Sequence, residues 1–227
     1  RIPAWPLGES SIMFLALLAI VGVSTGSSYL QEQPAERAKS PYDGAYIENL
    51  GQWPSDVYYM ARTPGLDVWL TRTGATYDFY RYSQGGQERV GHVVRVSFPD
   101  LTGTASQPGT RLAGHLNFLK SDGNTTTGVG RFAEARTSGR AGGTRWTLEE
   151  GRPRFDLILS PKADGRTAVR YEGVSDLHRN ERGEITFNTS VGNVSERKLV
   201  AYQETGAARK TLDCEIHVSS NAVSYRV

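Results

Sequence analysis

Apolar and polar residues alternate one by one along most of the chain after residue 45, and this period of two restricts the fold more than any other feature. Leu66, Val68 and Leu70 fall on one side of an extended backbone, with Asp67 and Trp69 on the other. The same alternation recurs over residues 92–98, 155–159, 212–218 and 223–227. Side chains of a strand point to opposite faces in turn, so each segment predicts a strand with one buried face.

Turn-forming pairs separate these segments at short intervals, among them Pro64-Gly65, Asp122-Gly123 and Asp164-Gly165. No segment after residue 30 carries a sustained helical stripe with caps. We therefore expect an all-β fold, either β-sandwich-like or built from paired antiparallel sheets. Residues 100–150 are poor in apolar side chains, and there we expect loops around two or three short strands, one of which contains Trp146 and Leu148.

The N-terminal part has a different pattern, an uninterrupted apolar run over residues 12–23 followed by small polar residues. Twelve apolar residues are too few for a membrane-spanning helix, which needs about 20, but they suit the core of a secretory signal peptide. We expect a signal-peptide helix at 1–28, a linker at 29–44 and a β-rich domain at 45–227, with no membrane span in the mature form. A buried helix or a short membrane anchor is the alternative. The alternation still running at Val227 suggests that the domain is truncated there.

Charge and cysteine content exclude several functions. The 227 residues contain 26 Lys and Arg against 24 Asp and Glu, a net charge of +2 that is too small for a nucleic-acid-binding surface. The single cysteine, Cys214, excludes an internal disulfide and lies on the apolar side of its predicted strand. The four histidines are far apart in sequence: His92, His115, His178 and His217. We expect no metal site and no cofactor.

Residues 53–82 are rich in aromatic side chains, which can stack on sugar rings or fill a partner's pocket when a sheet exposes them. Tyr77 and Phe79 fall on the strand face opposite Tyr80 and Tyr82, so at least one of these two sets belongs to the core. The residues of a possible binding surface are Trp53, Tyr58, Trp69, Tyr80 and Tyr82.

Four acidic residues occur within apolar strand segments: Glu48, Asp67, Asp78 and Asp156. Glycoside hydrolysis needs two carboxyl groups at a defined separation of about 5 to 10 Å. A hydrolase with a pair from this set is therefore one hypothesis, although acids that alternate with apolar residues usually form the solvated face of a strand. No residue pattern identifies a catalytic residue.

Several motifs resemble the N-terminal domain of unknown function of bacterial secreted proteins that carry SBBP repeats, the blades of a β-propeller. They are YIENLGQWP at 46–54, ARTPGLDVWL at 61–70, YDFY at 77–80, GHVVR at 91–95, GHLNF at 114–118, GRPRFDLILSPKAD at 151–164 and VAYQE at 200–204. The similarity extends over residues 45–227 and lapses between 117 and 152. It implies a β-rich, exported, surface-associated module with no assigned catalytic residues.

We expect a non-enzymatic, exported structural or interaction domain that precedes propeller repeats in a bacterial secreted or cell-surface protein. Its expected partners are those downstream repeats and a cell-surface glycan or protein, and nucleic acid is not among them. A carbohydrate-binding or adhesive module that uses the aromatic residues of 53–82 is the alternative, and a hydrolase with a carboxylate pair is the second alternative.

Overall fold

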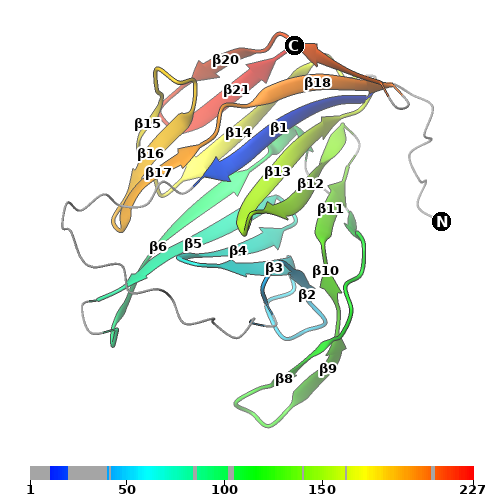
Figure 1. The fold of residues 1–227 in the computed structure, drawn as a ribbon, viewed down its shortest axis with the longest axis vertical. Helices are drawn as coiled ribbons and strands as arrows, with labels where there is room; N and C mark the ends of the chain where they lie inside the picture. Colours follow the sequence, from blue (N-terminus) through cyan, green and yellow to red (C-terminus); the bar gives the residue numbers. More distant parts are fainter. Residues whose placement is uncertain are drawn as a thin grey trace.

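The computed structural model describes residues 11–19, 40, 42–83, 86–101, 105–139, 141–161, 163–205 and 208–227. Two large antiparallel sheets make up this part of the chain (Figure 1). The described residues contain one short 3-10 helix, η1 (Pro99–Leu101), and no α-helix. The predicted all-β class with paired antiparallel sheets is confirmed.

The first sheet has nine strands, and its consecutive hairpins follow the alternation seen in the sequence. Gly65, at a φ of 78°, adopts the left-handed conformation needed for the tight turn between residues 57–63 and 66–71, two consecutive strands of this sheet. In spatial order the strands are β10 (Arg131–Phe132), β2 (Tyr46–Glu48), β3 (Val57–Thr63), β4 (Leu66–Thr71), β5 (Gly74–Tyr82), β6 (Arg89–Ser97), β14 (Arg166–Glu172), β21 (Ala222–Arg226) and β20 (Glu215–Val218).

The second sheet has ten strands. Eight follow in spatial order: β15 (Ser175–Arg179), β16 (Ile185–Thr189), β17 (Gly192–Glu196), β1 (Ser11–Ala19), β13 (Arg152–Leu159), β12 (Gly142–Glu149), β11 (Glu134–Ser138) and β7 (Ala105–Pro108). The other two are β18 (Val200–Thr205), which also pairs with β1, and β19 (Ala208–Leu212), which pairs with β18.

A separate hairpin of β8 (Leu116–Leu119) and β9 (Thr125–Val129) extends from the lower end of the molecule in Figure 1. The prediction of two or three strands within residues 100–150 is therefore wrong, because six strands lie there. Their alternation is weak in the sequence because Thr, Gly and Arg take many of the positions. Pairing with neighbouring strands, rather than apolar periodicity, defines them.

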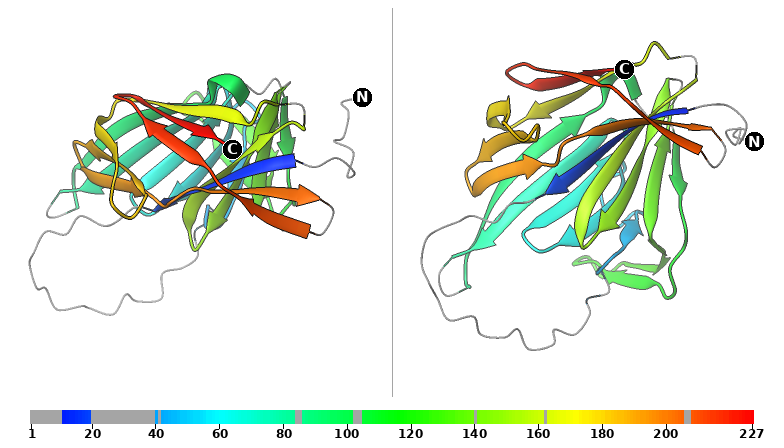
Figure 2. Two further views of the ribbon diagram at one scale, coloured as in Figure 1. Left: turned by 90° about the horizontal axis from the view of Figure 1, so that it is seen from above. Right: turned by 45° about the horizontal axis from the view of Figure 1, so that its top comes forward.

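One hydrophobic core lies between the two sheets, whose strands face each other in Figure 2. Leu66, Val68 and Leu70 of β4 are buried in it, as their spacing predicts. Phe155 and Leu157 of β13 contact the same core from the other sheet. The predicted inward faces of these strands are thus confirmed.

The predicted inward side of residues 212–218 is confirmed, but these residues belong to two strands and not to one. Leu212, Cys214 and Ile216 are half-buried and pack against the core, as expected. However, β19 ends at Leu212 and β20 begins at Glu215, so Cys214 lies between two strands. The thiol is free, and burial raises its pKa.

Part of the apolar N-terminal run is a strand. Residues 11–19 form β1, which pairs with β13, β17 and β18. The expected signal-peptide helix is thus not seen over these nine residues, and the remaining residues of 1–28 lie outside the described part of the chain. None of the described segments is a helix of sufficient length and hydropathy to cross a membrane.

The motif at 46–54 forms a turn organised by the side chain of Asn49. Its Nδ2 donates to the carbonyl oxygens of Pro54 at 2.8 Å and Val57 at 2.9 Å, and its Oδ1 accepts from Gly51 N at 2.9 Å. Asn and Asp are favoured in turns because their side chains replace backbone partners in this way. The motif therefore stabilises the entrance to β3.

Candidate functional site

A hollow lies on the solvent side of the nine-stranded sheet, over β3, β4, β5 and β6. Because Leu66, Val68 and Leu70 point into the core, Asp67 and Trp69 point outward. The hollow has a volume of about 860 Å³, and we call it the outer-face recess. Its lining residues are Ser40, Asp43, Arg62, Thr63, Pro64, Gly65, Asp67, Trp69, Asp78, Tyr80, Tyr82 and Arg89.

Two arginines and two aspartates form a connected network at its centre. Strand register sets Asp67 opposite both Arg62 on β3 and Asp78 on β5. Arg62 donates to both carboxylate oxygens of Asp67, at 3.0 and 3.1 Å. Arg89 Nη2 lies 2.8 Å from Asp78 Oδ2 and 3.8 Å from Asp67 Oδ2, so it bridges the two acids.

Burial differs across this network. The Asp67 side chain is only 6% exposed, whereas those of Arg62 and Arg89 are 45% and 40% exposed. A nearly buried carboxylate needs a partner, and the bidentate Arg62 contact supplies it. The hydrogen bond to Asp67 also raises the pKa of Arg62, and that to Asp78 raises the pKa of Arg89.

Aromatic rings flank the network. The Arg89 guanidinium lies over the Tyr80 ring at 4.2 Å from its centroid, and that of Arg62 over the Tyr42 ring at 4.9 Å. Tyr80 and Tyr82 meet edge to face at 5.9 Å, and Tyr82 is 58% exposed. Burial raises the pKa of Tyr80. The recess thus offers ring faces beside fixed hydrogen-bonding groups.

The structure brings together three of the five aromatic residues predicted to form a binding surface. Trp69, Tyr80 and Tyr82 line the outer-face recess. Trp53 is half-buried and packs edge to face on Trp69, with ring centroids 5.4 Å apart. Tyr58 lies in a smaller hollow of about 350 Å³, which Trp53 also lines. Tyr77 and Phe79 belong to the core, which confirms that at least one of the two opposed aromatic sets is buried.

Arg62 and Arg89 line the recess but were not predicted from the sequence to belong to a site. The Pro64-Gly65 turn fixes the register of β3 and β4 and so makes Arg62 and Asp67 cross-strand neighbours, a signal that the sequence contains, whereas Asp78 also requires the register of β4 with β5. Arg89 requires the register of β5 with β6, which places it opposite Tyr82.

Of the four acids considered for a hydrolase, only Asp67 and Asp78 come together. Both lie within 3.8 Å of Arg89 Nη2, inside a shared hollow. Glu48 lies elsewhere, where its Oε1 accepts a 2.6 Å hydrogen bond from Gly130 N. Asp156 lies in the other sheet. Two of the four acids therefore share one hollow.

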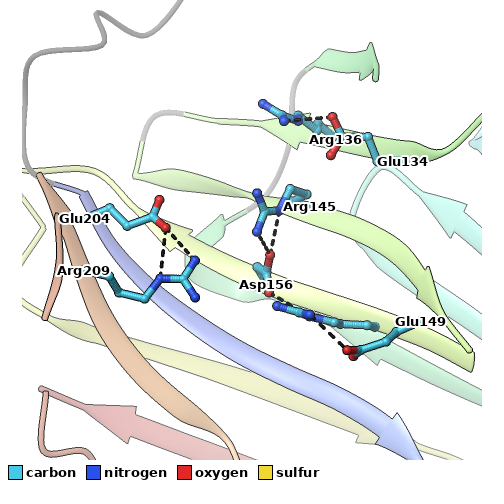
Figure 3. A network of polar contacts seen from close by, with 8 residues as sticks. Glu134, Arg136, Arg145, Glu149, Asp156, Glu204 and Arg209 are labelled. Carbon is cyan, nitrogen blue, oxygen red and sulfur yellow. Dashed lines mark hydrogen bonds and ion pairs between the residues drawn. The ribbon is translucent and has the colours of Figure 1, made fainter. Parts of the chain in front are cut away.

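Asp156 belongs to a second polar network, on the outer face of the ten-stranded sheet (Figure 3). Its side chain is 2% exposed and accepts a 2.7 Å hydrogen bond from Arg145 Nε. Arg154 Nε lies 3.6 Å from its other oxygen and also pairs with Glu149. Arg145 and Arg154 hold Asp156 by ion pairs, while Arg154 Nε and Asp156 Oδ1 have no hydrogen-bond partner among the described residues; we assign the network a structural role.

We predict that Asp156→Ala lowers the free energy of unfolding by about 1–3 kcal/mol, because it leaves two partly buried guanidinium groups without their carboxylate. Glu204→Ala is the control. It removes an ion pair with Arg209 in which both side chains are well exposed, and we expect a loss of about 0–1 kcal/mol. Urea unfolding measures both values. Equal losses in the two variants would contradict the structural role of Asp156.

The core contains a carboxyl group that was not predicted from the sequence. Glu196 of β17 is 1% exposed, and its Oε2 accepts a 2.7 Å hydrogen bond from the Tyr171 hydroxyl. Burial raises its pKa to about 7, and the Tyr171 hydrogen bond opposes part of that shift. The residues that alternate with Glu196 in β17 are also polar, so the alternation in the sequence did not predict that Glu196 is buried.

The histidines do not form a site. His92 lies beside Ser190 and the Gly173 carbonyl, and His178 beside Asp176 and Thr186. Within the described ranges, no three His, Cys, Asp or Glu side chains gather in a way that could hold a metal ion.

The described residues thus form an antiparallel, two-sheet β domain with a polar and aromatic recess on one outer face. A profile for a domain of unknown function, DUF7948, matches residues 46–227. The chain therefore belongs to the DUF7948 family. No curated protein and no solved structure gives a significant match to it.

Proposed function

We propose that this domain is a non-enzymatic binding module and that its outer-face recess takes a neutral, hydroxyl-rich ligand, most simply a glycan. The observation that carries the proposal is the placement of Tyr80, Tyr82 and Trp69 around an ordered Arg–Asp network in a hollow of about 860 Å³. Binding sites for small ligands combine apolar ring surface with a few fixed polar groups. Rings can cover the apolar face of a sugar, while guanidinium and carboxylate groups bond its hydroxyls.

The charge of the network favours a neutral ligand. The two guanidinium groups of Arg62 and Arg89 balance the two carboxylates of Asp67 and Asp78. Because these four charges cancel, neither an anion nor a cation gains a net Coulomb attraction to the network. A hydroxyl group can instead donate to a remaining carboxylate lone pair or accept from a remaining guanidinium N–H without breaking either pair.

The same pairing supports a binding role over hydrolysis. A glycosidase needs one carboxyl group that is free to give its proton to the leaving group. Here Arg62 occupies both oxygens of Asp67, and Arg89 occupies Asp78 Oδ2. The proximity of the two acids nevertheless keeps hydrolysis as the second candidate, and the experiment below distinguishes the two.

We also propose an exported setting, in a bacterial secreted or cell-surface protein in which propeller repeats follow the domain. The motif resemblance to the N-terminal domain of secreted bacterial proteins supports this setting. A recess for glycans would then face extracellular or cell-surface polysaccharide, which gives the domain an adhesive role.

The test is a glycan array with the full chain, followed by titration of the best ligand against variants. We expect Tyr82→Ala, Trp69→Ala and Arg89→Ala each to weaken binding by about 10-fold or more, because each removes a ring face or a fixed donor. Leu119→Ala is the matched control, since this side chain is 78% exposed on the β8–β9 hairpin, outside the recess, and we expect no change.

Circular dichroism of each variant separates loss of binding from loss of folding, which matters most for Trp69 because it also packs on Trp53. Absence of binding to every glycan would remove the proposal. Cleavage of a bound oligosaccharide that stops in Asp67→Asn and Asp78→Asn would replace the binding module with the hydrolase.

A further inference from the structure

Strand β1 holds the ten-stranded sheet together from its centre. It pairs with β13 over Ile12–Leu17, with β18 over Ser11–Leu15 and with β17 at Leu18 and Ala19. Figure 1 shows it lying between β13 and β18. Without it, the sheet would separate into β15–β16–β17, β18–β19 and β13–β12–β11–β7. One strand therefore supplies hydrogen-bond partners to three otherwise separate edges.

This central strand comes from outside the family domain. The DUF7948 match begins at residue 46, whereas β1 ends at Ala19. All the other strands of both sheets lie within the matched span. The domain thus contains the walls of a strand-shaped slot but not the strand that fills it.

We infer that the space between β13 and β18 is a strand-acceptor slot, and that its occupant in trans is an extended, predominantly apolar segment of a partner polypeptide. Residues 11–19 are the occupant in this structure. This inference goes beyond the glycan recess, since it concerns the opposite sheet and a different class of partner. Addition of a strand to an open sheet edge is an established mode of peptide recognition.

The walls of the slot define the chemistry of the segment it accepts. Open edges of β13 and β18 present rows of backbone N–H and C=O groups, which any extended segment can satisfy whatever its sequence. On the core side, Phe155, Leu157 and Leu159 of β13 and Ala201 of β18 are all buried. A segment placed between them needs apolar residues at every second position, because a polar group there would be buried without a partner.

The outer side of the slot is polar but neutral. Asp156 is held by Arg145 and Arg154, and Arg209 pairs with Glu204 (Figure 3). The Arg209 guanidinium also lies over the Tyr202 ring, 4.0 Å from its centroid. The charges of these ion pairs cancel, so they impose no charge on the occupant, although Arg154 Nε, Asp156 Oδ1 and the Tyr202 hydroxyl lack a hydrogen-bond partner among the described residues. The slot consequently selects for an apolar, strand-forming segment of low charge, which is the composition of residues 11–19.

The test breaks the pairing of β1 with β13 and β18 by a substitution in the full chain. Leu15 pairs with Asp156 on one side and Val200 on the other, so Leu15→Pro removes a central ladder position and is incompatible with a central strand. Leu15→Val keeps strand geometry and is the matched control. The probe is a fluorescent peptide with the sequence of residues 11–19, flanked by lysines for solubility, and a second peptide carries proline at the same position.

We expect the probe to bind Leu15→Pro at least about 10-fold more tightly than the wild type or Leu15→Val, in which the slot is filled. The proline-containing peptide should not bind. Hydrogen exchange should become faster at the amides of β13 and β18 in Leu15→Pro and slow again when the probe is added, while β4 and β5 stay protected. A folded Leu15→Pro protein that keeps full protection in β13 and β18 and ignores the probe would overturn the inference.

If the Leu15→Pro protein does not fold, a second experiment tests the same inference. A site-specific protease sequence within residues 29–39 of the full chain allows the N-terminal segment to be released after folding. Exchange of that segment for the probe supports the slot, and failure to exchange at any probe concentration overturns it. A dimer of the uncut chain that trades residues 11–19 between two copies would overturn the assignment of a separate partner.

Discussion

Replacing Trp146 with alanine is expected to lower the free energy of unfolding by about 3–5 kcal/mol. Trp146 of β12 is 1% exposed, and its ring lies 5.1 Å from that of Phe155 and 6.0 Å from that of Phe98. Its indole Nε1 donates a 2.9 Å hydrogen bond to Thr144 Oγ1. The substitution would leave a cavity in close-packed surroundings and a buried hydroxyl with one partner fewer. Urea unfolding followed by far-UV circular dichroism measures the loss.

Trp146→Phe is the control for this prediction, because it retains an aromatic ring and removes the N–H donor. We expect it to cost about 1–2 kcal/mol, less than the alanine variant, since most of the buried apolar surface remains. Trp146 also contacts Tyr77 of the opposite sheet, with ring centroids 6.5 Å apart. A loss below about 1 kcal/mol in Trp146→Ala would contradict a single core shared by both sheets.

The stability of the domain is expected to fall as the pH rises from about 4.5 to about 7, because of Glu196. Burial raises the pKa of this carboxyl from an ordinary 4.5 to about 7. Within that window the folded protein keeps a proton that the unfolded chain has already lost, so raising the pH favours unfolding. Below the window both states are protonated, and above it both are ionised. The total loss across the window is about 3 kcal/mol.

Glu196→Gln is expected to remove this dependence and to be the more stable protein above pH 7. Glutamine keeps a side-chain oxygen that can accept the hydrogen bond from Tyr171. Tyr77, Tyr171 and Tyr225 surround the carboxyl, and burial raises their pKa values well above 10, so they stay neutral throughout the window. Chemical unfolding at a series of pH values measures the effect. Parallel stability profiles of the wild type and Glu196→Gln would refute it.

The two surfaces proposed here occupy opposite sheets and can be tested independently. The outer-face recess depends on side chains of β3 to β6, whereas the slot depends on backbone groups of β13 and β18. Tyr82→Ala should leave peptide exchange unchanged, and Leu15→Pro should leave the Arg62–Asp67 pair in place. Binding of a glycan at the recess and of a strand at the slot would make the domain a link between a surface polysaccharide and a second polypeptide.

Much of the fold could be predicted from particular residues. The alternation of Leu66, Val68 and Leu70 predicts β4 with its correct inward face, whereas for β5 it predicts only that at least one of its two opposed aromatic sets is buried. The prediction succeeds because a strand with one wet face and one buried face must alternate, whatever it pairs with. Within 100–150 it failed, because strands such as β9 expose most of both faces and leave no alternation to read.

The candidate site was predicted in part. Outward aromatic residues of 66–82 were identifiable from the strand period, and Trp69, Tyr80 and Tyr82 do line one recess. The period of two does not state which strands are neighbours, so it could not pair Arg89 with Asp78 or separate Tyr58 from the other rings. Those relations follow from register and from the order of strands in the sheet.

The apolar run at 12–23 illustrates the same division. Its composition specifies a segment that avoids water, and this property is shared by a signal-peptide core and by a buried strand. Only the tertiary structure decided that residues 11–19 lie between β13 and β18, because two sheet edges there need hydrogen-bond partners. The sequence by itself determined which faces are apolar, since side-chain burial is a local property of an extended chain. The tertiary structure alone decided which edges and outward groups meet, since that depends on contacts between residues distant in the chain.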